Sequence, residues 1–305
     1  MRAVSYSQFG GPEVLYVAAD LPVPEPGPGQ VRVRVAASVV HPVDLMIRAG
    51  RFPAPLPTPL PYTPGWDVAG AVDAVGPSVG DFAVGDAVIG FSPWIRTTVG
   101  THAEYVVLDA AWLTFAPTGI PATEAAALPT NGLAAAQALD LLALPTGSTM
   151  LVTGAAGQVG GFVLALARAT GLHATGLAGV GDREFIQSQG AAFLPRSDDP
   201  IAAGPDGFDA VVDLAMIGPS LMELVRDGGG YVAASPPLRP EPAPGIRTFA
   251  LDVLPDGSRL GDLAKRAESG EIPLRVAAVH SFADAAAAHD RLAQGGVRGA
   301  VAVVP

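Results

Sequence analysis

The sequence predicts an α/β protein with a β-rich first part and a doubly wound parallel sheet in its second part. Residues 1–118 have the pattern of short strands between turns, whereas helical and strand patterns alternate from Pro121 onward. The stretch VTGAAGQVGG, Val152 to Gly161, concentrates glycine where a predicted strand meets a predicted helix. The 305 residues suffice for two domains with their own cores.

Strands dominate the prediction for residues 1–118. Apolar and other residues alternate over Val31–Val39, which is the period of a strand with one buried face. Further β-rich runs, bounded by Gly, Pro or Asp, are Asp67–Val75, Ala87–Phe91 and Ala103–Leu108. The segment PAPLPTPLPYTP, Pro53–Pro64, carries six prolines and predicts an ordered surface loop.

Helices and strands alternate in the second part, which predicts a parallel sheet built by right-handed crossovers. Two alanine- and leucine-rich helices flank Pro129. Predicted strands follow at Thr149–Val152, His173–Leu177, Ala210–Leu214 and Tyr231–Ala234, with helices at Gln158–Ala169, Arg183–Gln189 and Ser220–Val225. The last predicted elements are helices at Arg259–Glu268 and Ala283–Leu292 and strands at Arg275–Val279 and Gly299–Val303.

Charge and cysteine content exclude several classes of protein. Lys and Arg total 18 against 29 Asp and Glu, a net charge of −11, and no dense basic cluster occurs. Nucleic acids and anionic membranes attract basic surfaces, so neither is an expected partner. The lack of cysteine excludes disulfides, a thiolate nucleophile and cysteine-based zinc sites. Without a secretory pattern or an apolar run near the ~18 residues of a membrane span, we expect a cytoplasmic protein.

The glycines at 154, 157 and 160 predict a dinucleotide site. They fall where a turn leaves a strand, where backbone approaches a pyrophosphate, and where a helix presses against the sheet. The N–H groups at the start of the helix would favour the diphosphate. The predicted contacts are Gly154, Ala155, Ala156, Gly157, Gln158, Val159 and Gly160. The alternative is a parallel-sheet domain that binds no nucleotide.

The end of the strand His173–Leu177 favours NADP over NAD. An acid at this place would accept the ribose hydroxyls of NAD and repel the additional phosphate of NADP. Ala178 and Gly179 occupy the place, and the first acid, Asp182, follows beside Arg183. Arg183 is a candidate for pairing the 2′-phosphate, with an exposed arginine at a helix start as the alternative.

Separate motifs along the whole chain carry a resemblance to a known family. They are FGGPEVL (Phe9–Leu15), HPVDLMIRAGRF (His41–Phe52), YTPGWDVAGAVDAVG (Tyr62–Gly76), FAVGDAVIGF (Phe82–Phe91), EAAALPTNGLAAAQAL (Glu124–Leu139), VTGAAGQVG (Val152–Gly160) and HDRLAQGGVRGAVAVVP (His289–Pro305). With these motifs the chain resembles the zinc-independent, zeta-crystallin-like NADPH:quinone oxidoreductases of the medium-chain dehydrogenase/reductase superfamily.

This resemblance implies a domain organisation and a cofactor. Residues 1–118 and 270–305 would form a GroES-like catalytic domain, and residues 119–269 a Rossmann domain that binds NADPH. The active site would lie in the cleft between the domains, and homodimers would pair through the Rossmann sheets. Zinc-dependent relatives carry Gly-His-Glu where this chain has Gly65-Trp66-Asp67, so we expect no metal.

The resemblance also implies catalytic residues, His41 and Asp44. His41 stands where many members carry asparagine and could give a hydrogen bond or proton to a carbonyl oxygen as hydride arrives; a packed histidine is the alternative. Asp44 would orient the neighbouring loop or cap the helix Leu45–Ala49. Phe52 replaces a tyrosine common among relatives, and because it cannot give a proton, it weakens the case for a dedicated enoyl-thioester reductase.

Other side chains are implied near the cofactor or the substrate. Thr130 and Asn131 match a loop that borders the cofactor, and Tyr62 begins the YTPGWD motif. Phe249 and Leu251 fall near the segment that flanks the nicotinamide, with core packing as the alternative. The predicted cofactor contacts are therefore Thr130, Phe249 and Leu251, and the predicted substrate contacts are His41, Phe52, Tyr62 and Asn131.

The predicted function is hydride transfer from NADPH to a quinone or an α,β-unsaturated carbonyl acceptor, without metal. Because the nicotinamide carries the chemistry, the protein need only hold both reactants, exclude water and stabilise the oxyanion. Two alternatives stay open. One is a biosynthetic tailoring reductase with a narrow substrate, and the other is a protein that binds NADPH without turnover.

Overall fold

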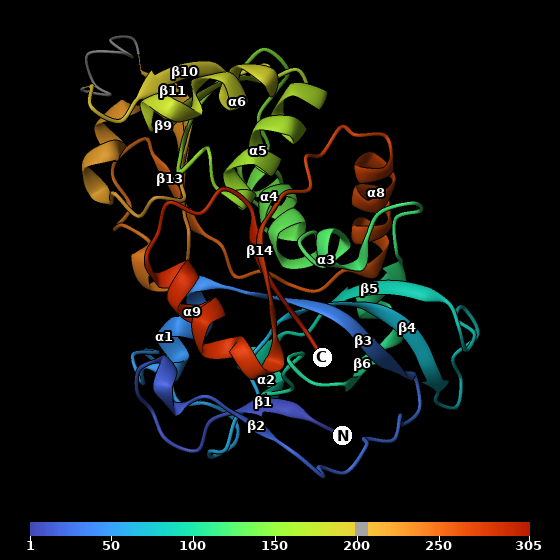
Figure 1. The fold of residues 1–305 in the computed structure, drawn as a ribbon. Coiled ribbons are helices and arrows are strands. Elements are labelled where there is room, and N and C mark those ends of the chain that lie inside the picture. Colours follow the sequence, from blue (N-terminus) through green and yellow to red (C-terminus); the bar gives the residue numbers. More distant parts are fainter. Residues whose placement is uncertain (199–206) are drawn as a thin grey trace. The chain divides into compact units, whose positions relative to one another are not determined.

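The computed structural model describes residues 1–198 and 207–305, which form two compact units (Figure 1). The first unit contains residues 1–133, 254–270 and 274–305, and the second contains residues 134–253 and 271–273. The domain boundaries expected after residues 118 and 269 stay a prediction.

A seven-stranded sheet is the centre of the first unit. Its order is β14-β15-β3-β4-β5-β7, with β6 paired to β3. The bounds are β3 (Gln30–Val40), β4 (Asp67–Val75), β5 (Ala87–Phe91), β6 (Tyr105–Asp109), β7 (Leu113–Phe115), β14 (Val276–Ser281) and β15 (Ala300–Val304), and β1 (Ala3–Ser5) pairs with β2 (Tyr16–Ala18) separately. Alternate residues of β3, Val31, Val33 and Val35, are buried in a valine-rich core, as the alternation predicts. β15 pairs antiparallel with β3, so the end of the chain completes this sheet.

Short helices surround the sheet of the first unit. They are η1 (Pro12–Val14), α1 (Pro42–Arg48), α2 (Trp94–Thr97), η2 (Ala110–Trp112), α3 (Ala122–Ala125), α8 (Gly257–Glu268), η6 (Phe282–Asp284) and α9 (Ala285–Ala293). The longer α4 (Pro129–Leu142) begins at a proline, which suits the first position of a helix, and runs from the first unit into the second. The proline-rich segment 53–64 contains no helix or strand, in agreement with the predicted loop.

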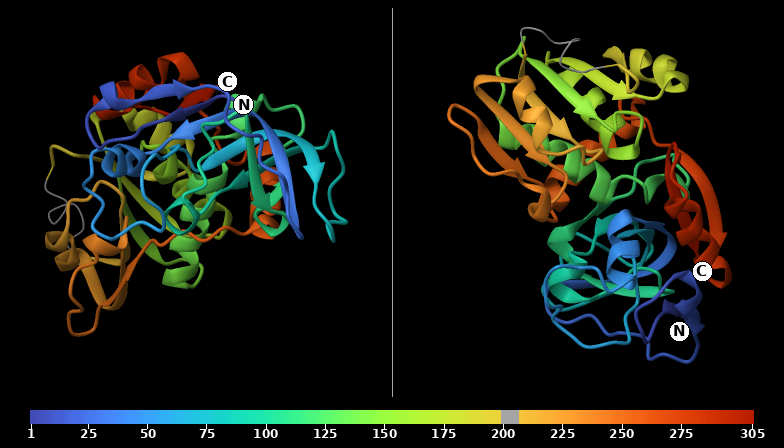
Figure 2. Two further views of the ribbon diagram at one scale, coloured as in Figure 1. Left: turned by 90° about the horizontal axis from the view of Figure 1, so that it is seen from below. Right: turned by 90° about the vertical axis from the view of Figure 1, so that its left-hand side faces the viewer.

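The second unit contains a fully parallel six-stranded sheet of order β10-β9-β8-β11-β12-β13. Green, yellow and orange strands of this unit are visible in the right-hand view of Figure 2. The strands are β8 (Thr149–Thr153), β9 (His173–Ala178), β10 (Ala192–Pro195), β11 (Phe208–Asp213), β12 (Val225–Ala233) and β13 (Arg247–Ala250). The helical segments are α5 (Gln158–Ala169), η3 (Val180–Asp182), α6 (Arg183–Ser188), η4 (Pro219–Leu224) and η5 (Pro236–Leu238). The predicted parallel sheet is thus confirmed.

Two details of the second unit differ from the prediction. The helix expected at 220–225 is the 3₁₀ segment η4, and Val225 belongs to β12, where it pairs with Phe208. The segment is short, because only five residues separate Pro219 from the first residue of β12. The edge strands β10 and β13 were not predicted, because four residues are too short to show a period.

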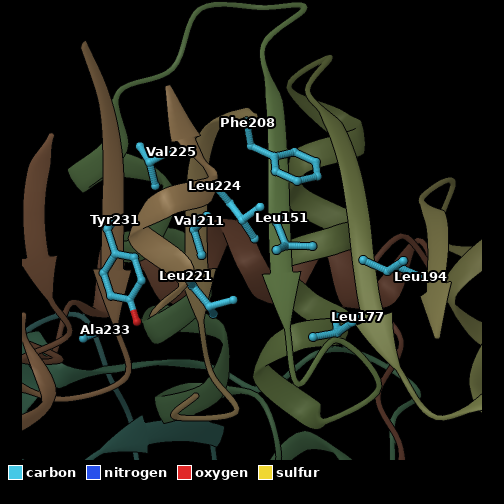
Figure 3. Packing of buried hydrophobic residues seen from close by; sticks show 10 residues of the cluster. All are labelled: Leu151, Leu177, Leu194, Phe208, Val211, Leu221, Leu224, Val225, Tyr231 and Ala233. Carbon is cyan, nitrogen blue, oxygen red and sulfur yellow. The ribbon is translucent and has the colours of Figure 1, made fainter. Parts of the chain in front are cut away.

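The two faces of this parallel sheet are covered differently. On one face Leu151, Val211 and Tyr231 pack against Leu221 and Leu224 of η4 (Figure 3). Burial of each such side chain contributes about 1.5–3 kcal/mol. The helices α5 and α6 pack on the opposite face. The turn that precedes α5 lies at the carboxyl ends of the strands.

Candidate active site

The glycine turn, Gly154–Gly160, joins β8 to α5 in the second unit. Gly154 has φ +61°, a conformation in which an L side chain is strained. A Cβ at Gly160 would lie 2.7 Å from the Cα of Ala155. From the sequence we expect Gly160 to allow close packing of the helix on the sheet. In the structure the close neighbour of Gly160 is the backbone of the glycine turn, at Ala155.

The first turn of α5 presents backbone N–H groups at this edge. The N–H of Gly161 donates to the carbonyl of Gly157, so those of Gln158, Val159 and Gly160 have no acceptor inside the helix. A helix N-terminus also carries a partial positive charge. The arrangement fits an anion such as a diphosphate.

Ala155 and Gln158, two predicted cofactor contacts in the glycine turn, have different surroundings. Ala155 is fully buried, and its Cβ is 3.0 Å from the position that a Cβ of Gly176 would take, so Ala155 packs against β9. The side-chain amide of Gln158 is buried, and neither its oxygen nor its nitrogen has a partner within residues 1–198 and 207–305. Because a buried amide without partners is costly, Gln158 has unused capacity to bind a polar group.

A buried carboxylate fixes the loop beside the glycine turn. Asp213, the last residue of β11, accepts hydrogen bonds from the hydroxyls of Thr153 (2.6 Å) and Tyr231 (2.8 Å). It also accepts from the backbone N–H groups of Gly218 (2.8 Å) and Ile217 (3.2 Å). Burial and the bond to Asp213 raise the pKa of Tyr231, so its hydroxyl stays a donor. The network ties the carboxyl ends of three adjacent strands together, and sequence analysis did not identify it.

The predicted NADP-selecting residues lie at the end of β9. Ala178 is the last residue of the strand, and Gly179 follows it without adding an acid. The guanidinium carbon of Arg183 lies 4.3 Å from the ring centroid of Phe193 in β10. Arg183 therefore stacks on an aromatic side chain of its own unit.

Phe249 and Leu251, the predicted nicotinamide contacts, lie at the β13 edge of the sheet. Phe249 is half-buried, and the guanidinium of Arg247 is 5.6 Å from its ring centroid. Leu251 is buried, and its N–H donates to the carbonyl of Ala233 at 3.0 Å. Their role toward the nicotinamide stays a prediction.

In the first unit, a buried hydrogen-bonded chain joins three polar side chains. The Nε2 atom of His41 lies 2.7 Å from Oδ2 of Asp67, which is fully buried. The backbone N–H of Thr130 donates to Oδ1 of Asp67 at 2.8 Å, and the Thr130 hydroxyl donates to the same oxygen. Both oxygens of the carboxylate are therefore held, and Thr130, predicted as a cofactor contact, is bonded to Asp67.

Asp44 holds the backbone at His41 and at Gly65, near the two ends of the hydrogen bond between His41 and Asp67. Its Oδ2 accepts from the backbone N–H of His41 at 2.8 Å. Its Oδ1 accepts from the N–H of Gly65 and from Nε1 of Trp66, both at 3.1 Å. The expectation that Asp44 caps a helix Leu45–Ala49 is wrong, because α1 begins at Pro42 with His41 as its N-cap, and Asp44 is the third helical residue, whose carboxylate accepts from the N-cap backbone. The same carboxylate also orients the turn that leads to Asp67.

The charge of His41 is set by opposing effects. Burial lowers the pKa of His41, but the charge and hydrogen bond of Asp67, together with the charge of Asp44, raise it more. The pKa of His41 therefore lies above its ordinary value of 6.5. The ring is consequently protonated over more of the neutral pH range than a free histidine.

The other predicted substrate residues differ in burial and in hydrogen bonding. Tyr62 is buried, packs edge to face against Tyr6 and Trp94, and donates its hydroxyl to the carbonyl of Thr58. Asn131 is buried and donates from its amide to the carbonyl of Ala127 at 2.8 Å. Phe52 is half-buried after α1.

Asp67 is the main residue of the first unit that sequence analysis missed. It was considered only as the replacement for a zinc-motif glutamate, although it begins the otherwise apolar strand segment DVAGAV. A carboxylate in a buried strand requires a partner. That pattern could have indicated a site at this position.

Neither a metal cluster nor a membrane helix is found where the structure describes the chain. No group of three or more His, Cys, Asp or Glu side chains in residues 1–198 and 207–305 is placed to hold a metal ion. Within those same residues, every helix is too short or too polar to cross a bilayer.

Comparison with known proteins agrees with this architecture. Residues 27–118 match the family described as alcohol dehydrogenase GroES-like domain, and residues 186–303 match the family described as zinc-binding dehydrogenase. The chain is 31% identical over 281 residues to 2-methylene-furan-3-one reductase of Solanum lycopersicum. It is 32% identical over 283 residues to the chloroplastic NADPH-dependent alkenal/one oxidoreductase of Arabidopsis thaliana. Each match covers 89% of this chain and 70% of the relative.

A solved structure extends the similarity over the full length. The quinone oxidoreductase from Coxiella burnetii superposes with a TM-score of 0.89 at 26% identity, covering 100% of this chain and 99% of that one. The fold and the matched families define an oxidoreductase with a GroES-like and a Rossmann-like part. The chain belongs to the quinone oxidoreductase family of the medium-chain dehydrogenase/reductase superfamily. The predicted family and fold class are confirmed.

Proposed function

We propose that the chain transfers hydride from NADPH to a quinone or an α,β-unsaturated carbonyl compound, without a metal. The glycine turn before α5 carries the proposal, because its shape fits a dinucleotide diphosphate. The names of similar proteins support the rest: one is an NADPH-dependent alkenal/one oxidoreductase, and another is a quinone oxidoreductase.

The second unit supplies the residues that would hold the cofactor. The N–H groups of Gln158, Val159 and Gly160 would bind the diphosphate, and the strand end, where neither Ala178 nor Gly179 is an acid, would admit a 2′-phosphate. When bound, NADPH supplies the hydride. The Asp213 network would keep the loop next to the glycine turn in place.

The first unit supplies a proton and a countercharge for the reduced acceptor. Hydride addition leaves negative charge on the acceptor oxygen, which a protonated His41 would stabilise and then neutralise. Because Asp67 accepts at Nε2, a proton given to the acceptor would have to leave from Nδ1 of His41. Thr130 holds the other oxygen of Asp67 and so keeps the carboxylate in position. Asp44 positions the backbone of His41.

The proposal is tested by cofactor oxidation against a panel of small quinones and enones, with NADPH and NADH in parallel. We expect turnover of several acceptors, with NADPH preferred. Turnover of a single enone would indicate the narrow tailoring reductase. Binding of NADPH without oxidation by any acceptor would contradict the catalytic proposal and indicate a binding protein.

Two further features belong to this proposal. A homodimer is expected from the organisation of the family, and β13 is the last strand in the sheet order of the second unit, so it offers an edge for pairing. A cytoplasmic location is expected from the composition. Light scattering of the purified chain measures the oligomeric state directly.

A further inference from the structure

A second arginine lies at the end of β9, where the sequence drew attention only to Arg183. The backbone N–H of Arg196 donates to the carbonyl of Ala178 at 2.8 Å, so the residue after β10 is fixed beside the last residue of β9. The Nη2 atom of Arg196 lies 3.5 Å from the position that a Cβ of Gly179 would occupy. The guanidinium therefore lies over the strand end itself.

Arg183 is directed to another part of the sheet. Its guanidinium covers Phe193, and Phe193 pairs with Gly176 in the register of β9 and β10. Gly176 precedes Gly179 by three residues, so the backbone of Phe193 is paired about 10 Å back along the strand. In doubly wound folds the adenosine ribose lies at the end of the second strand. Arg196 is the arginine at that point.

One carboxylate lies at the same point. Oδ2 of Asp182 is 3.1 Å from the position that a Cβ of Gly179 would occupy, on which the guanidinium of Arg196 also converges. An arginine fork matches the geometry of a phosphate, whereas a carboxylate repels a phosphate and accepts ribose hydroxyls. The strand end thus presents one group that favours a 2′-phosphate and one that opposes it.

We propose that Arg196, rather than Arg183, binds the 2′-phosphate of the cofactor, and that Asp182 limits the resulting preference for NADPH over NADH. Gly179 itself carries no side chain between the carboxylate of Asp182 and the guanidinium of Arg196. The inference rests on the proposed function, because it requires a nicotinamide dinucleotide at this edge.

The test measures binding of adenosine fragments, so that it does not depend on turnover. Isothermal titration of the full chain with adenosine 2′,5′-bisphosphate and with 5′-AMP separates the contribution of the 2′-phosphate from that of the rest of the nucleotide. We expect Arg196→Ala to weaken the bisphosphate roughly 10- to 100-fold and 5′-AMP much less. Arg196→Lys should recover part of the loss, because it keeps the charge without the fork. Asp182→Asn should tighten the bisphosphate by about 3- to 10-fold.

Two matched arginines give the controls. Arg168 lies in the last turn of α5, before β9 begins, so Arg168→Ala should leave the ratio of the two affinities unchanged. Loss of bisphosphate affinity in Arg183→Ala, with normal affinity in Arg196→Ala, would overturn the proposal. Equal binding of both nucleotides by the wild type would overturn it too, while leaving an NADH-dependent reductase possible. Failure of the wild type to bind either nucleotide, NADPH or NADH would overturn the proposed function as well. Thermal unfolding of each variant shows that the fold is retained.

Discussion

Two buried histidines of the first unit, His41 and His289, differ in the charge of their nearest partner. His41 lies against the carboxylate of Asp67 at 2.7 Å. His289 is fully buried, and its Nδ1 lies 2.9 Å from Nη1 of Arg48. The pKa of His41 is raised, whereas burial, followed by the charges of His102 and Arg48, lowers the pKa of His289 to about 2.

The partner also decides where the proton of His289 resides. Arg48 can only donate, so Nδ1 of His289 must accept, and the neutral ring carries its proton on Nε2. That Nε2 has no hydrogen-bond partner in the described part of the chain. The His102 ring lies edge to face at 6.3 Å, and burial, the main cause, lowers its pKa as well. The rings of His289 and His102 are therefore neutral, whereas the ring of His41 can carry a second proton beside Asp67.

The difference teaches that burial alone does not determine the role of a histidine. Desolvation disfavours the imidazolium at both places, and it is outweighed only where a carboxylate faces the ring. A proton donor and a structural histidine can therefore occupy one unit. Changes to the partner groups should separate the two roles.

The largest effect is expected from Asp67→Asn. Without the carboxylate, burial would dominate and the pKa of His41 would fall below 6.5. Wild-type turnover should decline as pH rises through the raised pKa of His41, and in Asp67→Asn this decline should begin at lower pH. At neutral pH we expect about a 10²-fold lower kcat, measured as kcat against pH with a quinone that the wild type reduces.

Three further variants accompany this measurement. Asp73→Asn removes another carboxylate of β4, one that pairs with Arg32 at 2.6 Å, and should keep the wild-type profile. His41→Asn should lose the same alkaline decline, and the double variant with Asp67→Asn should be no slower than the more affected single variant. An unchanged profile in both single variants would show that His41 gives no proton.

The next effect is on stability in acid and concerns His289. Its folded pKa of about 2 lies below the ordinary 6.5, so the unfolded chain binds more protons between these values. The free energy of unfolding should therefore fall as pH drops below 6.5, by about 1.4 kcal/mol per pH unit from this residue. His289→Gln keeps an acceptor for Arg48 and cannot titrate. Urea unfolding from about pH 6 to about pH 4 should show a shallower pH dependence for this variant.

The comparison of slopes isolates His289, because all other groups titrate in both proteins. If the two proteins lose stability equally with acid, His289 is not held neutral, and the contrast with His41 fails. His41→Gln is the matched variant. The stability that its pairing contributes is present below pH 6.5 and lost as pH rises through the raised pKa, so this variant should change the alkaline side instead.

The sequence predicts the regular elements of the fold better than the contacts in its sites. The run Asp67–Val75 and the helix Gln158–Ala169 have the predicted bounds, because hydrophobic period and glycine placement act locally. His41 and Asp67 are 26 residues apart, and Asp67 and Thr130 are 63 apart. These contacts depend on the register of β3 with β4 and on where α4 begins, which no local pattern determines.

The difference between local patterns and tertiary pairing also explains which residues at the proposed cofactor site were predicted. The glycine turn was predicted because strand, turn and helix are consecutive in the chain. The sequence analysis considered Arg183 and not Arg196, because Arg183 lies close in sequence to the end of β9. Arg196 reaches that place through pairing of β10 with β9, and β10 itself was not predicted. Tertiary pairing, not composition, brings such residues together.

The smallest effect is expected from Thr130→Val, which removes the hydroxyl donor to Oδ1 of Asp67 and keeps the backbone donor at 2.8 Å. A carboxylate that loses one donor holds its charge less favourably but still faces His41. We expect kcat to fall by about 3- to 10-fold, the equivalent of one hydrogen bond, with the alkaline limit of the pH profile displaced only slightly. Thr130→Ser retains the hydroxyl and should restore most of the activity. If Thr130→Val were as slow as Asp67→Asn, the threonine would have a role of its own, such as a contact with the cofactor, and the proton would not depend on the His41–Asp67 pair alone.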